Sequence, residues 1–235
     1  MLQHIMKLAT DNGLHQFNIL SQATLNVANI NTNGYKTRRF DHYLTSDNRL
    51  DGVVRYDYSQ GPIMMTTREL DVAIDGEGFI PVTGPDGKVA YTRDGSFGKN
   101  SEGYLVTNWG DLVGNGIQLP GNYKKLFIQK DGAVEVLMPG KQTAEQVGKI
   151  DLVTFRNLEG LKLGDNNRLL PTDDSGGPVA VTSGTEIKQG NLERSNVNVF
   201  HQVDHVLRLN AGIISNLRIV KFTDDIYRQA VNLRQ

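Results

Sequence analysis

Residues 70–82 read LDVAIDGEGFIPV, and this stretch decides the fold class. Two short apolar runs, Leu70–Ile74 and Phe79–Val82, lie on either side of an Asp75-Gly76 pair. Because Asp-Gly accepts the backbone geometry of a tight turn, the pattern predicts two antiparallel strands joined by a short connection. The middle of the chain is therefore expected to be β structure.

The same pattern continues towards the C-terminus. Further apolar runs follow, with Asp-Gly pairs between some of them at 86–87, 94–95 and 131–132. The runs are Val89–Thr92, Tyr104–Thr107, Leu126–Ile128, Ala133–Leu137 and Ile150–Phe155. We expect a mainly antiparallel β domain over residues 70–185, either barrel-like or a sandwich.

The two ends of the chain have the spacing of long helices instead. Residues 2–30 and 197–233 each carry an apolar stripe at alternating steps near three and four. The first helix is expected to end within residues 29–34, NINTNG, because Asn and Gly favour a helix C-terminus. The stripes comprise Leu2, Met6, Ala9, Gly13, Phe17, Leu20, Thr24 and Val27 in the first helix, and Val203, Val206, Ile213, Leu217, Val220, Tyr227 and Val231 in the second.

The fold class is therefore predicted to be α+β, with long N- and C-terminal helices forming a paired, coiled-coil-like module. Asn210 and Asp224 fill gaps in the C-terminal stripe, where polar residues would fix the register of the helices rather than add stability. Ile219 and Ile226 fall on the opposite side, so more than one contact surface is expected. The alternative is a single intramolecular helix pair with two exposed isoleucines.

These patterns divide the chain into five segments. Residues 1–34 are predicted to be an N-terminal assembly helix and 197–235 a C-terminal one. Residues 35–69 have no clear period and are predicted to be an extended arm or linker. The central β domain covers 70–185, and 186–196 is a return linker.

The composition argues against several classes of function. The 235 residues include 25 Lys and Arg against 26 Asp and Glu, so no basic excess is available for binding nucleic acid. The absence of cysteine excludes disulfides, thiolate catalysis and cysteine-ligated zinc. No basic segment followed by an apolar one is present at the N-terminus, and no apolar run approaches the roughly 20 residues of a membrane span. We expect neither a cleaved signal peptide nor membrane insertion.

One short motif matches an enzyme signature. Residues 174–178, DSGGP, resemble the end of the trypsin-like serine-protease signature, in which the serine is the nucleophile. The upstream histidines are His4, His15 and His42, and none lies in the sequence context of that family. The motif is therefore interpreted as a turn between strands, and a β-scaffold hydrolase that uses Ser175 is kept as an alternative.

Two other groups of residues carry side chains that could bind a metal or transfer protons. His201 and His205 lie four apart on a helix, but the glutamate of a zincin motif and an obvious third ligand are missing. Asp71, Asp75 and Glu77 do not have the spacing of an EF-hand loop. We expect no metal and no cofactor, although the carboxylates belong to the hydrolase alternative.

A further alternative is a cell-wall-binding module. Trp109, the only tryptophan, is the residue that would stack on a sugar ring, although a core or interface position is the simpler interpretation.

Three segments together resemble the flagellar basal-body rod and hook proteins. Residues 21–36, SQATLNVANINTNGYK, resemble the N-terminal signature of that family. Residues 70–79, with YTRDGSF at 91–97 and GYLVT at 103–107, resemble its central β domain. Residues 189–199, QGNLERSNVNV, resemble its approach to the C-terminal helix. The segments occur in the order of the family and bracket nearly the whole chain.

This resemblance implies a structural subunit of the axial rod, not an enzyme. It implies self-association through the terminal helices around an export channel, with an arm after Gly34 that bridges neighbouring subunits and a β domain in the outer layer. The implied partners are copies of the chain and other axial rod and hook subunits. The implied location is the basal body, in the periplasmic space, after type III export without a cleaved signal.

The single β domain and the short length favour a rod subunit over the hook protein, and the distal rod type slightly over the proximal one. Residues 209–216, LNAGIISN, depart from the usual glutamine-arginine-alanine-tyrosine-glutamate-alanine-asparagine but keep Ala211 and Asn216. The residues expected at the assembly interface are Leu20, Val27, Asn29, Asn31, Thr32, Gly34, Tyr35, Leu192, Ser195, Asn196, Val197, Val203, Val206, Ile213, Leu217, Val220 and Tyr227.

Overall fold

The computed structural model describes residues 2–46 and 50–232 of the chain, so Met1 and residues 233–235 of the predicted terminal helices lie outside the described residues. The chain forms two compact units. The helical unit comprises Met1–Ile30, Thr37–Asp57 and Val197–Gln235, and the β unit comprises Asn31–Lys36 and Tyr58–Asn196. The backbone therefore passes between the units after residues 30, 36, 57 and 196.

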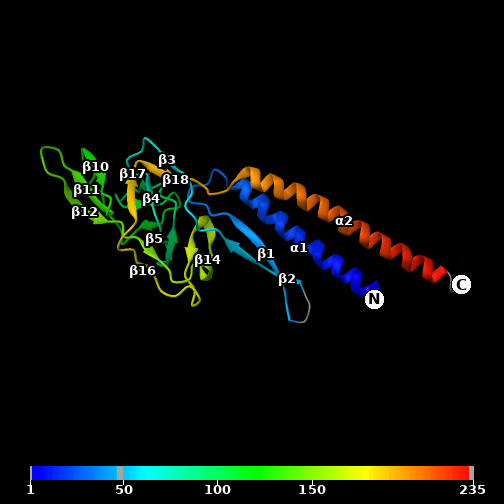
Figure 1. Ribbon diagram of the computed structural model, residues 1–235. Coiled ribbons are helices and arrows are strands. Elements are labelled where there is room, and N and C mark those ends of the chain that lie inside the picture. Colours follow the sequence, from blue (N-terminus) through cyan, green and yellow to red (C-terminus); the bar gives the residue numbers. More distant parts are fainter. Residues whose placement is uncertain (1, 47–49, 233–235) are drawn as a thin grey trace. The chain divides into compact units, whose positions relative to one another are not determined.

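The helical unit contains two long helices and one hairpin (Figure 1). Helices α1 (Leu2–Ala28) and α2 (Val199–Asn232) lie side by side and run antiparallel (Figure 1). Strands β1 (Arg38–Leu44) and β2 (Leu50–Tyr56) pair antiparallel along their whole length. Neither helix has, over its described residues, an apolar stretch that could cross a membrane.

The β unit is built from short strands, and every pairing between its named strands is antiparallel. The largest sheet has the strand order β14-β15-β6-β5-β9-β8-β7, and a three-stranded sheet has the order β10-β11-β12. The strands are β3 (Ile63–Met65), β4 (Val72–Asp75), β5 (Ile80–Thr83), β6 (Val89–Thr92), β7 (Gly98–Lys99), β8 (Leu105–Val106), β9 (Leu112–Val113), β10 (Lys125–Ile128), β11 (Ala133–Leu137), β12 (Glu145–Lys149), β13 (Val153–Thr154), β14 (Lys162–Leu163), β15 (Leu169–Leu170), β16 (Val179–Ala180), β17 (Glu186–Gln189) and β18 (Asn191–Glu193), with short 3-10 helices at Leu158–Gly160 and Asp165–Asn167.

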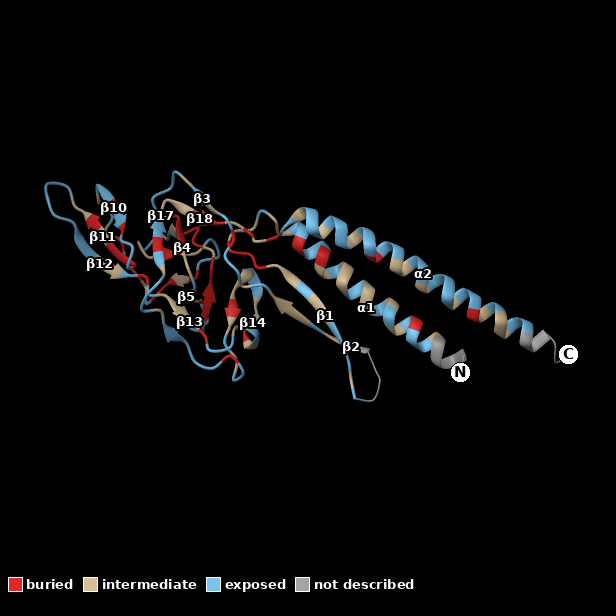
Figure 2. Ribbon diagram, viewed as in Figure 1, coloured by how far each residue is buried: buried red, intermediate tan, exposed pale blue. Residues whose placement is uncertain are grey.

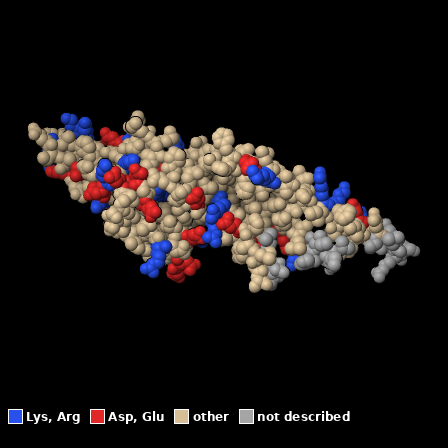
Figure 3. Space-filling model, in the orientation of Figure 1, with Lys and Arg blue, Asp and Glu red and all other residues tan. Residues whose placement is uncertain are grey.

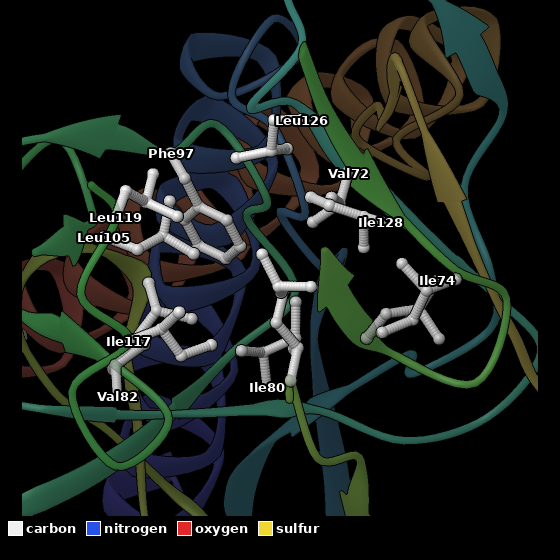
Figure 4. Close-up of a cluster of buried hydrophobic side chains, with 14 of the residues drawn as sticks. Val72, Ile74, Ile80, Val82, Phe97, Leu105, Ile117, Leu119, Leu126 and Ile128 are labelled. Atoms are coloured by element: carbon white, nitrogen blue, oxygen red, sulfur yellow. The ribbon is translucent and has the colours of Figure 1, made fainter. Parts of the chain in front are cut away.

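The large apolar core lies in the β unit. Alternate residues of the strands point inwards, so that Val72, Ile74 and Ile80 pack with Phe97 and Leu105 in one buried cluster (Figure 4). A second, aromatic cluster contains Phe79, Tyr91 and Phe155, and the rings of Tyr91 and Phe155 meet edge to face at 4.8 Å. Figure 2 shows buried residues concentrated in the β unit and few of them on the helices.

The two predicted helices and the antiparallel β domain are present, so the α+β class is confirmed at that level. The apolar runs predicted as strands correspond to β4, β5, β6, β8, β10, β11 and β13. The pairing predicted across Asp75-Gly76 is wrong, because β4 pairs with β17 whereas β5 pairs with β6 and β9. The segment predicted as an arm contains the β1–β2 hairpin and β3, and the predicted return linker contains β17 and β18. Strand β17 pairs with β4 and strand β18 pairs with β3. Because these partners are distant in the sequence, no local pattern predicts the two strands.

Candidate assembly site

The Glu193 carboxylate lies at the centre of a buried ionic cluster in the β unit. Its side chain is fully buried, and Lys36 Nζ lies 2.6 Å from Oε1 while Arg93 Nε lies 2.8 Å from Oε2. The backbone N–H of Gly61 donates a third hydrogen bond to Oε1 at 2.9 Å. We call Lys36, Arg93 and Glu193 the Glu193 cluster.

Backbone carbonyl oxygens accept further hydrogen bonds from both cations of the cluster. Lys36 Nζ also donates to the Ser59 carbonyl at 2.6 Å. Arg93 Nη1 donates to the carbonyls of Gly76 at 3.0 Å and Gly78 at 2.7 Å. Because a buried charge is tolerated only when it is paired and hydrogen-bonded, these contacts fix the positions of the segments that provide them.

The cluster joins all three segments that carry the family resemblance. Lys36 ends the first segment, Arg93 lies in the second, and Glu193 lies in the third. The backbone geometry at residue 34 explains why glycine stands there. The Gly34 N–H donates to the Glu193 carbonyl at 2.8 Å, and the φ of Gly34 is 66°. A Cβ at this position would lie 2.5 Å from the Arg93 carbonyl carbon, so glycine is the residue that fits.

The contact face between α1 and α2 contains part of the predicted stripes together with polar residues that the stripes did not include. The residues of α2 that are buried or half-buried at steps of four and three are Gln202, Val206, Leu209, Ile213, Asn216, Val220, Thr223 and Tyr227. Val203 and Leu217, which the stripe assigned to the seam, are instead 50% and 64% exposed. On α1, Gln16 is half-buried and bonded to Asn216, whereas Phe17 is 58% exposed. The contact face is therefore more polar than predicted.

As a consequence, both helices carry exposed apolar residues. The space-filling view shows that much of the visible surface of the helical unit is uncharged (Figure 3). The exposed apolar residues are Leu8, Leu14, Phe17, Leu25 and Val27 on α1, and Phe200, Val203, Leu207, Ile214, Leu217, Ile219 and Phe222 on α2. A pair of helices with this much exposed apolar surface is typical of a chain that binds a partner.

Ser175, the serine of the protease-like motif, is held by hydrogen bonds within a turn. It is fully buried, and its Oγ donates to the Thr172 carbonyl at 2.8 Å and accepts from the Thr172 N–H at 3.0 Å. No histidine is among the recorded hydrogen-bond partners of its hydroxyl. The motif is a hydrogen-bonded turn, as the turn interpretation expects.

The carboxylates of the hydrolase alternative are also engaged elsewhere. Asp75 forms an ion pair with Lys188 and accepts from Gln60 Nε2 at 3.3 Å, and these hydrogen bonds hold the pKa of Asp75 below its ordinary value. A general acid would need a raised pKa instead. Asp71 is buried beside Arg68 at 3.4 Å. His201 and His205 are exposed, and no group of three metal-ligating side chains occurs among the described residues.

The residues expected at the assembly interface fall into three sets. Some are buried, and the remainder are divided between half-buried and exposed positions. The buried ones are Gly34, Tyr35, Leu192, Ser195 and Val197; the half-buried ones are Leu20, Asn29, Thr32, Asn196, Val206, Ile213, Val220 and Tyr227; the exposed ones are Val27, Asn31, Val203 and Leu217. Trp109 is 62% exposed on the loop between β8 and β9.

Sequence reasoning missed the pairing of Lys36, Arg93 and Glu193. Each of these residues stands in a quoted segment, but a charged residue near a turn ordinarily indicates a solvated surface. No signal in the sequence singles out these three residues, because the same segments carry other charged residues as well. These are Arg194 and the carboxylates Asp71, Asp75, Glu77 and Asp94.

Comparisons with known proteins agree on one family. A family described as the flagellar hook protein FlgE/F/G D1 domain matches residues 73–136, within the β unit. The chain is similar to the flagellar basal-body rod protein FlgG of Buchnera aphidicola subsp. Schizaphis graminum, with 32% identity over 97% of this chain and 98% of the relative. FlgG of Caulobacter vibrioides is 30% identical over 89% of this chain and 91% of the relative. FlgF of the same bacterium is 32% identical over 88% and 87%.

Proposed function

Because the chain belongs to the family of flagellar basal-body rod proteins, we propose that it assembles with copies of itself through its two terminal helices. The chain is a structural subunit of the basal body, and the family is not one of enzymes. Membership also implies assembly with other axial subunits of the flagellum.

The observation that carries the proposal is the exposed apolar face of α2. Phe200, Leu207 and Ile214 follow one another at steps of seven, and all three are more than half exposed. Burying such side chains against another copy contributes about 25 cal/mol for each Å² removed from water. The lost freedom of the chain ends offsets part of this gain, so association is expected to depend on concentration.

In the assembled state the helices pack in a coiled-coil-like layer around the export channel. Steps of three and four between apolar residues suit that packing. The β1–β2 hairpin, with exposed Tyr43, Leu44 and Val53, contacts neighbouring subunits, and the β unit forms the outer layer. The subunit reaches the periplasmic space by type III export.

Sedimentation velocity of the full-length chain tests the self-association. We expect large species that grow with concentration for the natural sequence, and monomers for the variant Leu207→Ser/Ile214→Ser. The matched control is Val89→Ser/Val179→Ser, which removes two exposed valines from the β unit and should associate like the natural chain. Association of the helix variant at the natural level would contradict the proposal, as would a natural chain that stays monomeric at high concentration.

A further inference from the structure

The contact face between α1 and α2 is joined by hydrogen bonds between side chains. Asn216 Nδ2 donates to Gln16 Oε1 at 2.9 Å, and Asn12 Nδ2 donates to Asn216 Oδ1 at 3.4 Å. Nearer the start of α2, Asn26 Nδ2 donates to Gln202 Oε1 at 3.2 Å. All of these pairs belong to one antiparallel alignment of the helices.

Gly212 makes room for one of these side chains. A Cβ at Gly212 would lie 2.6 Å from Gln16 Nε2, so a larger residue here would displace the Gln16 amide from its place beside Asn216. The amide of Gln16 therefore occupies the space that any other residue at position 212 would fill. This contact ties the position of Gln16 to one turn of α2.

Asn26 ties the same alignment to a third element. It is 1% exposed, its Nδ2 donates to the Arg38 carbonyl at 2.7 Å, and its Oδ1 accepts from the Arg38 N–H at 2.8 Å. Because Asn26 is held by the start of β1, α1 is fixed against the hairpin while Gln202 fixes α2 against α1. The alignment therefore has one anchor near the hairpin and another near Asn216.

We propose that these polar contacts determine the register of the helix pair. Apolar residues at steps of three and four can pack equally well after a slip of seven residues, or about 10 Å. The same slip would place Leu209 where Gln202 meets Asn26 and Thr223 where Asn216 meets Gln16, so Asn26 would lose its hydrogen-bond partner on α2 and Gln16 would lose its amide partner. The register-determining residues are Asn12, Gln16, Asn26, Gln202, Gly212 and Asn216.

The consequence for assembly rests on the proposed function. Copies that share one register present their exposed apolar residues at the same height, so that Phe200, Leu207 and Ile214 can meet equivalent surfaces in every neighbour. A mixture of registers would present several different surfaces. The polar contacts thus select the surface that the helix pair offers to other copies.

The test measures the register directly in the full-length chain. The chain has no cysteine, so cysteines introduced at the exposed positions Ser21 and Arg228 can carry spin labels, and double electron–electron resonance gives the distance between them. These two positions lie about 30 Å apart along the helix axis, so a slip along that axis changes the distance directly. The test variant is Gln16→Leu/Gln202→Leu/Asn216→Leu, which removes the contacts between the helices at both anchors. The matched control is Asn18→Leu/Asn210→Leu/Gln229→Leu, which replaces amides by leucine at exposed positions of the same helices.

We expect one narrow distance in the natural chain and in the control. The test variant should keep its helical content by circular dichroism and gain a second population displaced by about 10 Å. The natural distance alone in the test variant, a second population in the control, or a broad distribution in the natural chain would overturn the proposal. Dilute labelled chain is measured, so a failure of self-association in sedimentation leaves this result intact and contradicts only the proposed function.

Discussion

Glu193 accepts hydrogen bonds from three parts of the β unit that are far apart in the sequence. Lys36 and Arg93 precede it by 157 and 100 residues, and Gly61 by 132. Such a group is costly to bury alone, but the cost is recovered when each charge has a partner in good geometry. The Glu193 side chain therefore holds three distant backbone segments together.

Glu193→Gln should destabilise the β unit strongly. The change leaves Lys36 and Arg93 buried without a compensating carboxylate, for which we expect a loss of about 3–5 kcal/mol in the free energy of unfolding. Chemical denaturation followed by near-ultraviolet circular dichroism and by the fluorescence of Trp109, which lies in the β unit, measures it. The control is Glu145→Gln in the exposed pair with Lys141, where we expect less than about 0.5 kcal/mol. Equal effects of both substitutions would show that the buried cluster contributes no more than a surface pair.

The helices and the sheets are stabilised by different contacts. Sheets of the β unit enclose a buried apolar core, whereas α1 and α2 meet through a face that includes Gln16, Gln202 and Asn216. Because local opening is easiest where few apolar contacts are buried, the helices should open more readily than the sheets.

Amide hydrogen exchange of the dilute full-length chain should show this difference. We expect the amides of α1 and α2 to exchange orders of magnitude faster than those of β4, β5 and β11, and fastest towards the chain ends. At concentrations where the chain associates, the helices should become protected while the β unit changes little. Equally strong protection of helices and sheets in the dilute chain would refute this expectation.

The elements also show what sequence patterns can predict. The helices were predicted because 27 and 34 residues of periodic sequence give a strong signal. The contact face was predicted only in part, since Val206, Ile213 and Val220 lie on it as expected. Apolarity favours Phe17 over Gln16 and Leu217 over Asn216, whereas the structure uses hydrogen bonds and the space at Gly212. The two-residue strands and the Glu193 cluster depend on partners far away in the sequence, and no local pattern contains that information.

In the whole molecule, the backbone passes between the two units four times. Lys36 and Asn196 are the last residues of the two segments that make up the β unit. The β unit is therefore complete only when its first six residues, Asn31–Lys36, are joined to a strand that lies just before α2. Removal of that strand should affect the β unit more than removal of α2 itself.

Two shortened chains test this expectation. A chain ending at Asn196 keeps β18 and Glu193, whereas one ending at Gly190 lacks both, and the two lack α2 equally. We expect the longer one to unfold cooperatively, by the fluorescence of Trp109, and the shorter one to unfold at a clearly lower denaturant concentration. Coincident unfolding curves would contradict a role of residues 191–196 in completing the β unit.

The distance between Lys36 and Glu193 along the chain has a consequence in time as well as in space. Ribosomes make the N-terminus first, so Lys36 and Arg93 emerge long before the carboxylate with which both pair. A partial chain holds two cations that cannot be buried favourably, and its early β segments lack the contact that settles them. Nearly the whole sequence must therefore be made before the first forty residues can reach their final positions. An interrupted chain that lacks Glu193 keeps Lys36 and Arg93 without the carboxylate that allows their burial.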